Sequence, residues 1–252
     1  MHSNSLLLAA ATSVSFLADL ASAHGFVTGV RVNEGTWFPG ADPVWYYYPQ
    51  GAPATTGWNS LNQDLGFVSP SDFGSNNIAC HKSATPGKLY INANAGDSLT
   101  IYWNTWPGDS HKGPVINYLA QCNGECTNAN AGSLSFTKFD AQGYSSGTWA
   151  TDRITAPNNF TTTVRIPPRL RPGNYVLRHE IIALHGAGSD NGAQNYPQCL
   201  NVKIGGGGSV SLPGGTPGNR LYTRSDPGIR FNLYTNNINY PIPGPALWTG
   251  AN

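Results

Sequence analysis

Apolar side chains recur at every second position in several short segments, which is the pattern of a β-strand with one buried face. The clearest case is residues 174–185, which follow the turn-forming pair Pro172-Gly173. Six side chains of this segment would share one face: Tyr175, Leu177, His179, Ile181, Ala183 and His185. Further strands are predicted at residues 26–32, 162–166 and 198–204.

Two more features of this pattern predict how the strands are joined. In residues 26–32, one face would carry Phe26, Thr28, Val30 and Val32. Residues 89–103 are predicted to form a β-hairpin, because two alternating runs flank the turn at residues 95–98. Helical patterns are limited to a turn or two, at residues 60–64 and 69–73. The sequence therefore predicts an all-β, antiparallel β-sandwich of the immunoglobulin-like or fibronectin-III-like type, with long loops and short helical turns.

Composition agrees with a loop-rich β protein and argues against two other classes. Charged residues make up 11% of the 252 residues, against about 25% in an ordinary soluble domain, and the net charge is +1. This charge is too small for an electrostatic nucleic-acid binder. The 7 Trp, 12 Tyr and 9 Phe can cover a sizeable core, which argues against a disordered chain. The 30 Gly and 19 Pro suit long loops.

Residues 1–23 have the features of a secretory signal peptide. An apolar run begins at Leu6, and Ala21-Ser22-Ala23 supplies a small-residue cleavage site. A transmembrane anchor needs about 20 apolar residues, and Asp19 interrupts this run. We therefore expect a secreted, extracellular protein with no membrane partner, whose mature chain begins at His24.

Residues 24–252 are expected to form a single domain with no appended carbohydrate-binding module. The glycines at 205–208 resemble a linker, but no second module follows them. The tail beyond them is rich in large aromatic residues, which favours a segment that lies back on the domain: Tyr222, Phe231, Tyr234, Tyr240 and Trp248.

The four cysteines are expected to form two disulfides, because an even number in a secreted chain favours such pairing. Cys122 and Cys126 flank the turn-forming tripeptide Asn-Gly-Glu and can pair locally. That leaves Cys80 and Cys199 as the second, long-range pair. A zinc site is the alternative, but the CxxC spacing typical of such sites is absent.

A histidine at the mature N-terminus offers two nitrogens in one chelate, its α-amine and its ring Nδ1. A second imidazole, such as that of His111, would complete three nitrogens in a plane and leave one equatorial position open. Tetragonal nitrogen ligation suits Cu(II), and copper is also favoured by the general order of divalent-metal affinities. Each histidine taken alone is more simply interpreted as incidental, so the combination of motifs decides.

The motifs occur in a specific order: His24, residues 109–114, 179–185 and 194–199, and the closing residues 240–245. As a set, over the whole mature chain, they resemble the fungal lytic polysaccharide monooxygenases of auxiliary activity family 9, formerly glycoside hydrolase family 61. The resemblance implies one copper ion per chain, held by His24 and His111 with Tyr196 as a distant axial ligand. It also implies that His185 and Gln194 lie near the open coordination position, whereas His179 is structural.

The activity implied by the resemblance is oxidative cleavage of β-1,4-glucan such as cellulose, by hydrogen abstraction at C1 or C4. It requires O₂ or H₂O₂ and an external electron donor, which is a small-molecule reductant or a partner dehydrogenase. The resemblance further implies a substrate contact at Tyr240, and we expect a monomer. Five other aromatic residues are weaker candidates for that contact, because core packing explains them equally well: Tyr234, Trp45, Tyr46, Tyr47 and Tyr48.

Two alternative functions remain open at this stage. A hydrolytic glucanase would need two suitably spaced carboxylates, which a sequence cannot exclude. A non-enzymatic protein that binds copper or cellulose would use the same histidines without turnover. Asn159 begins the sequon Asn-Phe-Thr and is a candidate for N-glycosylation, and the resemblance allows methylation of His24.

Overall fold

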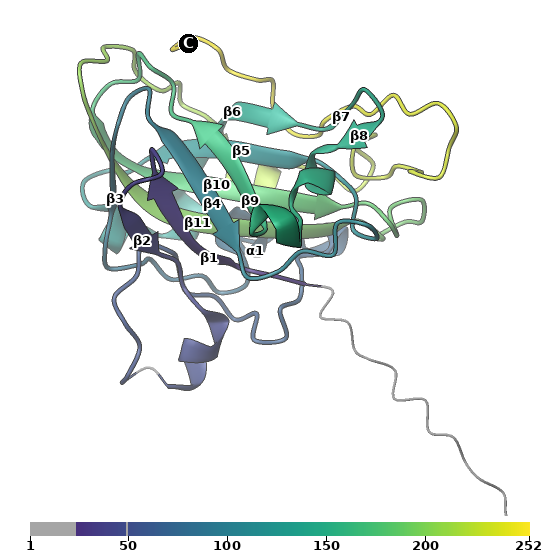
Figure 1. Cartoon of the computed structure of the whole chain (residues 1–252), viewed down its shortest axis with the longest axis horizontal. Coiled ribbons are helices and arrows are strands. Elements are labelled where there is room, and N and C mark those ends of the chain that lie inside the picture. Colours follow the sequence, from purple (N-terminus) through teal and green to yellow (C-terminus); the bar gives the residue numbers. More distant parts are fainter. Residues whose placement is uncertain (1–23, 49) are drawn as a thin grey trace, which may run out of the picture.

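The computed structural model describes residues 24–48 and 50–252, so the predicted signal peptide at residues 1–23 lies outside the described residues. Two facing sheets form a β-sandwich, as predicted (Figure 1). The smaller sheet has the strand order β2 (Trp37–Pro39), β1 (Val27–Val32), β4 (Ser98–Trp103) and β9 (Thr161–Arg165). The larger has the order β12 (Thr216–Pro217), β6 (Ser135–Gln142), β5 (Val115–Gln121), β10 (Gly173–Ala183), β11 (Gln194–Gly205) and β3 (Ile91–Asn94).

The other elements are short and lie in the loops. Strands β7 (Tyr144–Ser145) and β8 (Thr148–Trp149) form a small hairpin. The only α-helix of the described residues is the single turn α1 (Asn77–Cys80). The 3₁₀ turns are η1 (Pro43–Tyr47), η2 (Pro70–Asp72), η3 (Cys126–Asn128), η4 (Ala131–Ser133), η5 (Ala150–Arg153), η6 (Ala156–Asn158) and η7 (Gly218–Arg220). Residues 60–64 form a bend and a turn instead of the helical turn that we expected. Within the described ranges, no helix is long and apolar enough to span a membrane.

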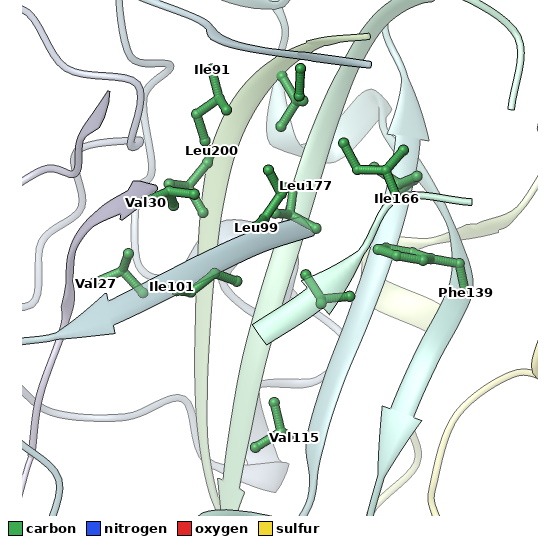
Figure 2. Packing of buried hydrophobic residues seen from close by; sticks show 14 of the residues in the cluster. Val27, Val30, Ile91, Leu99, Ile101, Val115, Phe139, Ile166, Leu177 and Leu200 are labelled. Carbon is green, nitrogen blue, oxygen red and sulfur yellow. The ribbon is translucent and has the colours of Figure 1, made fainter. Parts of the chain in front are cut away.

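The central strand β10 is buried on both of its faces. Its odd-numbered side chains, such as Leu177 and Ile181, enter the core between the sheets, where Figure 2 shows Leu177 near Leu99 and Ile101. Its even-numbered side chains, such as Val176 and Ile182, enter a second apolar cluster beneath the loops. Strand β10 therefore has the predicted face, but it ends at Ala183, so His185 lies just beyond it.

A buried ion pair ties this strand to its surroundings. Arg178 and Glu180 are both fully buried, with Arg178 Nη1 2.6 Å from Glu180 Oε2. Arg178 also donates to the carbonyls of Ile78 (2.7 Å) and Ala79 (2.8 Å). Glu180 accepts from Asn195 Nδ2 at 2.9 Å and from the Tyr222 hydroxyl. The pair thereby joins β10 to the α1 turn, β11 and the C-terminal tail. Every charged atom of the pair has a hydrogen-bond partner, as burial requires.

The predicted hairpin at residues 89–103 is wrong. Strand β3 pairs with β11 in the larger sheet, whereas β4 pairs with β1 in the smaller one. The turn between them crosses from one sheet to the other, held by Asp97, whose carboxylate accepts from Asn94 N at 2.7 Å. Alternation fixes which face of a strand is buried, but it does not fix the strand's partner.

Two further strand predictions are corrected. The pairing of β1 with β4 shifts by one residue between Val27 and Gly29, so Val27 and not Thr28 faces the core. Strand β11 also begins earlier than residue 198 and runs through Pro197, which pairs with Glu180. Asn195 and Cys199, two residues to either side of Pro197, direct their backbone polar groups away from β10. Pro197 has the same orientation, so its missing N–H removes no hydrogen bond to β10.

Both expected disulfides are confirmed. Cys80 is bonded to Cys199, which links the α1 turn to β11, and Cys122 is bonded to Cys126. The tail also lies back on the domain, as expected, because Lys138 Nζ donates to the Pro243 carbonyl at 2.7 Å and Tyr222 is buried.

We expect Glu180→Ala to lower the free energy of unfolding by about 3–5 kcal/mol, because it leaves the Arg178 charge buried and uncompensated. Chemical denaturation followed by fluorescence measures this change. The matched control is Asp190→Ala, which breaks the exposed ion pair with Arg224 and should cost less than about 1 kcal/mol. Equal losses in the two variants would contradict the role given to the buried pair.

Candidate metal centre

His24 is positioned by the segment that follows it. Phe26 N donates to Asn104 Oδ1 at 2.8 Å, and Asn104 N donates to the Phe26 carbonyl at 3.0 Å. A Cβ at Gly25 would lie 2.3 Å from the Thr105 carbonyl, so only glycine allows the two segments to approach this closely. The N-terminal segment is therefore held against the end of β4.

His111 is positioned by a short segment that runs beside the end of β10. Leu184 N donates to the Lys112 carbonyl at 2.9 Å, and Ile182 N donates to the Pro114 carbonyl at 3.2 Å. Between these contacts, a Cβ at Gly113 would lie 1.8 Å from the Ile182 carbonyl. This close approach brings His111 next to His185, with ring centroids 4.1 Å apart.

The rings of four predicted site residues meet at one end of the sandwich. The His24 ring lies 5.9 Å from that of His111, at 90°, and 5.7 Å from that of Tyr196. His111 and His185 are in contact, as described above. These residues come from separate segments, so the fold brings together what the sequence keeps up to 172 positions apart.

The environment keeps the imidazoles in the state that a metal requires. Burial, with smaller effects of His185 and His24, lowers the pKa of His111 to about 4, so its ring is neutral in mildly acidic solution. Burial also lowers the pKa of His24, although Asp64 opposes the shift. His111 Nδ1 lies 2.8 Å from Ser110 Oγ. This bond occupies Nδ1 and leaves Nε2 as the ligating atom.

Gln194 and Tyr196 are coupled by a hydrogen bond. They project from the same face of β11, and the Tyr196 hydroxyl donates to Gln194 Oε1 at 2.7 Å. Burial raises the pKa of Tyr196 far above its ordinary value, so the phenol stays protonated. Because the carbonyl of Gln194 is occupied, its amide NH₂ is the group left to donate to a ligand in the site.

The donor set fits copper under one condition. Among residues 24–48 and 50–252, no group of three His, Cys, Asp or Glu side chains could hold a metal ion. Two imidazoles and one phenol are present, and the third nitrogen must be the α-amine of His24. Nitrogen donors without thiolate or paired carboxylates suit Cu(II) better than calcium, magnesium or structural zinc. The site therefore fits copper in a chain that begins at His24.

His179 lies inside the sandwich, in a separate polar contact. Trp103 Nε1 donates to His179 Nε2 at 3.1 Å, and His179 Nδ1 is 2.7 Å from Asn117 Oδ1. Burial lowers its pKa to about 3. This satisfied core histidine has the structural role that was predicted for it.

Three residues of the site were not predicted from the sequence. Trp106 packs edge-on to Tyr196, with centroids 5.2 Å apart, and Phe67 lies 6.1 Å from the His24 ring. Ser110, which holds His111, lies in the motif of residues 109–114 and was the one residue of the three with a usable signal. The two aromatic residues belong to loops and show no periodicity.

Tyr240, the expected substrate contact, is half-buried in the C-terminal loop. Its ring packs between Trp149 and Phe231, with both centroid distances 4.9 Å, and its hydroxyl donates to the Gly228 carbonyl at 2.7 Å. Part of the Tyr240 ring is therefore used in packing, and its contact with the substrate stays a prediction. In the same loop, Tyr234 is 74% exposed and lies against the His185 carbonyl. Tyr46, Tyr47 and Tyr48 are also exposed, whereas Trp45 is half-buried.

Comparisons with known proteins agree on one family. A model of Auxiliary Activity family 9 (formerly GH61) matches residues 24–240. The chain is 49% identical, over 92% of its length and 94% of the relative's, to an AA9 family lytic polysaccharide monooxygenase F of Emericella nidulans. A protein of the same printed name from Malbranchea cinnamomea is also 49% identical, over 94% of this chain and 96% of the relative.

Solved structures give the same result. Cel61B from Hypocrea jecorina superposes with a TM-score of 0.85 at 42% identity, over 89% of this chain and all of that chain. The extended catalytic domain of H. jecorina LPMO9A superposes with a TM-score of 0.84 at 45% identity, over 91% and 92% of the two chains.

We expect Gly113→Ala to destabilise the protein by about 1–3 kcal/mol and to weaken Cu(II) binding, because the added methyl group forces His111 away from β10. Thermal unfolding and titration against a competing chelator measure the two effects. Gly74→Ala is the control, since a Cβ at that position meets no atom within 4 Å. Unchanged copper affinity in Gly113→Ala would show that this approach does not position the site.

Proposed function

We infer the function from a single premise: the chain belongs to auxiliary activity family 9, formerly glycoside hydrolase family 61. It is a copper-dependent lytic polysaccharide monooxygenase, which cleaves cellulose by oxidation. The relatives are named as oxidative enzymes, and neither a hydrolytic glucanase nor a non-enzymatic carrier is favoured. The observation that carries the assignment to this site is the meeting of His24, His111 and Tyr196 at one end of the sandwich.

One copper ion per chain would be held by the His24 α-amine, the rings of His24 and His111, and, at longer range, the Tyr196 hydroxyl. When bound, copper supplies the redox chemistry that activates O₂ or H₂O₂ for hydrogen abstraction at C1 or C4 of the glucan. The chain's own residues fix the geometry of this reaction. The α-amine and the two imidazoles would be the principal ligands, because the neutral Tyr196 hydroxyl is a weaker donor than these nitrogens.

His185 and Gln194 are the residues that we assign to the open side of the site. The Gln194 amide is oriented by Tyr196, and it presents its NH₂ group as a hydrogen-bond donor. His185 lies against the His111 ring and is kept largely neutral because burial lowers its pKa. Together they would orient the oxygen co-substrate without serving as ligands.

The substrate surface is proposed to include Tyr234, which is more exposed than the half-buried Tyr240, the contact that the resemblance implies. An exposed ring beside His185 can stack on a sugar face at the edge of the metal site. The exposed residues Tyr46, Tyr47 and Tyr48 are weaker candidates on the 43–48 segment.

Several further properties are part of the proposal. Residues 1–23 would be removed as a signal peptide, so that residues 24–252 are secreted as a single catalytic domain and a monomer. The family requires an external reductant. Asn159 is exposed at the end of η6, which suits a glycan at its side chain.

Mass spectrometry of the sugars released from cellulose tests this function. Copper-loaded protein beginning at His24 should release aldonic acids or 4-keto sugars with ascorbate, and none without reductant or with a chelator. Unoxidised oligosaccharides formed without reductant would instead establish a hydrolase. Tight copper binding with no released product would establish a carrier.

Gln194→Ala should keep its copper affinity while its turnover falls by about 10- to 100-fold, because the substitution removes an orienting donor and no ligand. Chelator competition and the rate of oxidised-sugar release measure the two quantities. Gln198→Ala, four residues further along β11, is the control. Full turnover in Gln194→Ala at complete copper occupancy would refute this role.

Tyr234→Ala should bind cellulose at least threefold more weakly with unchanged copper affinity, because one stacking ring is lost while the ligands stay in place. A pull-down binding isotherm measures the change. Tyr240→Phe, which keeps the packed ring, should bind cellulose normally. If Tyr234→Ala binds cellulose normally and a folded Tyr240→Ala variant does not, the substrate contact is Tyr240.

A further inference from the structure

A cavity of about 510 Å³ is lined in part by His185, whereas His24 is not among its lining residues. The His111 ring lies near both of these histidine rings. We propose that it binds the small-molecule electron donor, and that this donor is a neutral hydroquinone or catechol. The inference rests on the proposed monooxygenase function, which requires a reductant but assigns it no site.

Two walls of the cavity are apolar and largely aromatic. The β7–β8 hairpin supplies Tyr144 and Trp149, whose ring centroids are 5.2 Å apart. The C-terminal loop supplies Leu233, Tyr234 and Ile238 on the other side. A planar ring of one or two hydroxyl groups is small enough for this volume and can stack on either wall.

The remaining wall is polar, and a salt bridge and a backbone hydrogen bond hold it in place. It contains Ser110, Lys112 and Asp152. Lys112 Nζ lies 2.7 Å from Asp152 Oδ1, and Asp152 Oδ2 accepts from Trp149 N at 2.8 Å. The lysine is therefore fixed at the wall, and the carboxylate ties this wall to the aromatic one. Such groups can hydrogen-bond the hydroxyls of a phenolic ligand.

The charge of the cavity favours a neutral donor over an anionic one. Its lining includes one lysine and two aspartates, Asp109 and Asp152. Asp152 is neutralised by Lys112, and Asp109 is exposed and in no ion pair of the described residues. The net charge of about −1 repels ascorbate and carboxylated phenols, because charges separated by less than about 10 Å in water are incompletely screened.

The cavity also adjoins a proposed copper ligand. Ser110 Oγ is 2.8 Å from His111 Nδ1, and the His185 ring contacts the His111 ring. A hydroquinone bound here would give one electron to Cu(II), which becomes Cu(I), and one phenolic proton to solvent. It would then leave as its one-electron-oxidised radical. The aromatic side chains of the cavity favour a flat aromatic ligand.

Ligand-observed NMR on the copper-free protein, beginning at His24, tests binding without any turnover. Hydroquinone should bind saturably. Ile238→Trp, which fills the cavity, should weaken this binding at least fivefold. Hydroquinone binding that does not saturate, or that is unchanged in Ile238→Trp, would overturn the proposal. Saturation by cellohexaose but not by hydroquinone would also overturn it, because the cavity would then belong to the glucan site.

A second measurement uses an exposed residue, whose substitution does not threaten folding. The loss of the Cu(II) electron paramagnetic resonance signal reports reduction of the loaded protein. Asp109→Lys should raise the ratio of the rate constants for reduction by ascorbate and by hydroquinone about threefold or more, because the added positive charge attracts the anion and not the neutral donor. Asp72→Lys on η2, which makes the same charge change away from the cavity, is the matched control. Equal acceleration in both variants would contradict a local site.

Failure of this inference is distinguishable from failure of the proposed function. Protein reduced by dithionite needs no phenol site. If it releases oxidised sugars while hydroquinone does not bind, only the donor site is wrong. If it releases none despite bound copper, the monooxygenase assignment itself fails.

Discussion

The buried ion pair of Arg178 and Glu180 is the interaction on which the rest of this structure depends. Two charges without solvent are tolerated only because their remaining atoms are bonded to the α1 turn, β11 and the C-terminal tail. The same segments are also held by pairing between β10 and β11, by the Cys80–Cys199 disulfide and by the Lys138 contact with Pro243. The pair therefore adds a buried link between these segments and β10, the strand whose end adjoins His111 and His185.

The metal centre is assembled by close backbone approach as much as by side chains. His24 and His111 lie on segments without regular structure, and each is brought into place where glycine allows a carbonyl to come near. Tyr196 and Gln194, by contrast, lie on β11, which is pinned by the Cys80–Cys199 disulfide three residues beyond the tyrosine. A site with strands on one side and fixed loops on the other can keep ligand positions constant while it stays open to a large substrate.

Whether a feature of the fold or the site can be predicted from the sequence depends on how far apart in the sequence the interacting residues lie. The face of β10, the Cys122–Cys126 disulfide and the sandwich class follow from local patterns, because alternation and spacing are local. The long-range Cys80–Cys199 pair follows only as the one that remains. The partner of β3 does not, because Ile91–Asn94 alternates equally well beside β4 or β11. Tyr240 and Tyr234 show the same limit within one loop. Both are tyrosines near a proline-rich end, and only tertiary packing decides which ring is packed against neighbours and which is exposed.

The central claim is that the N-terminal histidine supplies two of three nitrogens to one copper ion. Electron paramagnetic resonance of the Cu(II) protein, with the hyperfine couplings of coordinated nitrogen resolved, tests it most directly. A chain that begins at His24 should show three equatorial nitrogens, and a chain that retains Ala23 should lose the amine coupling and bind copper more weakly. Identical spectra and affinities in the two chains would contradict the account, because the α-amine would then have no part in the site.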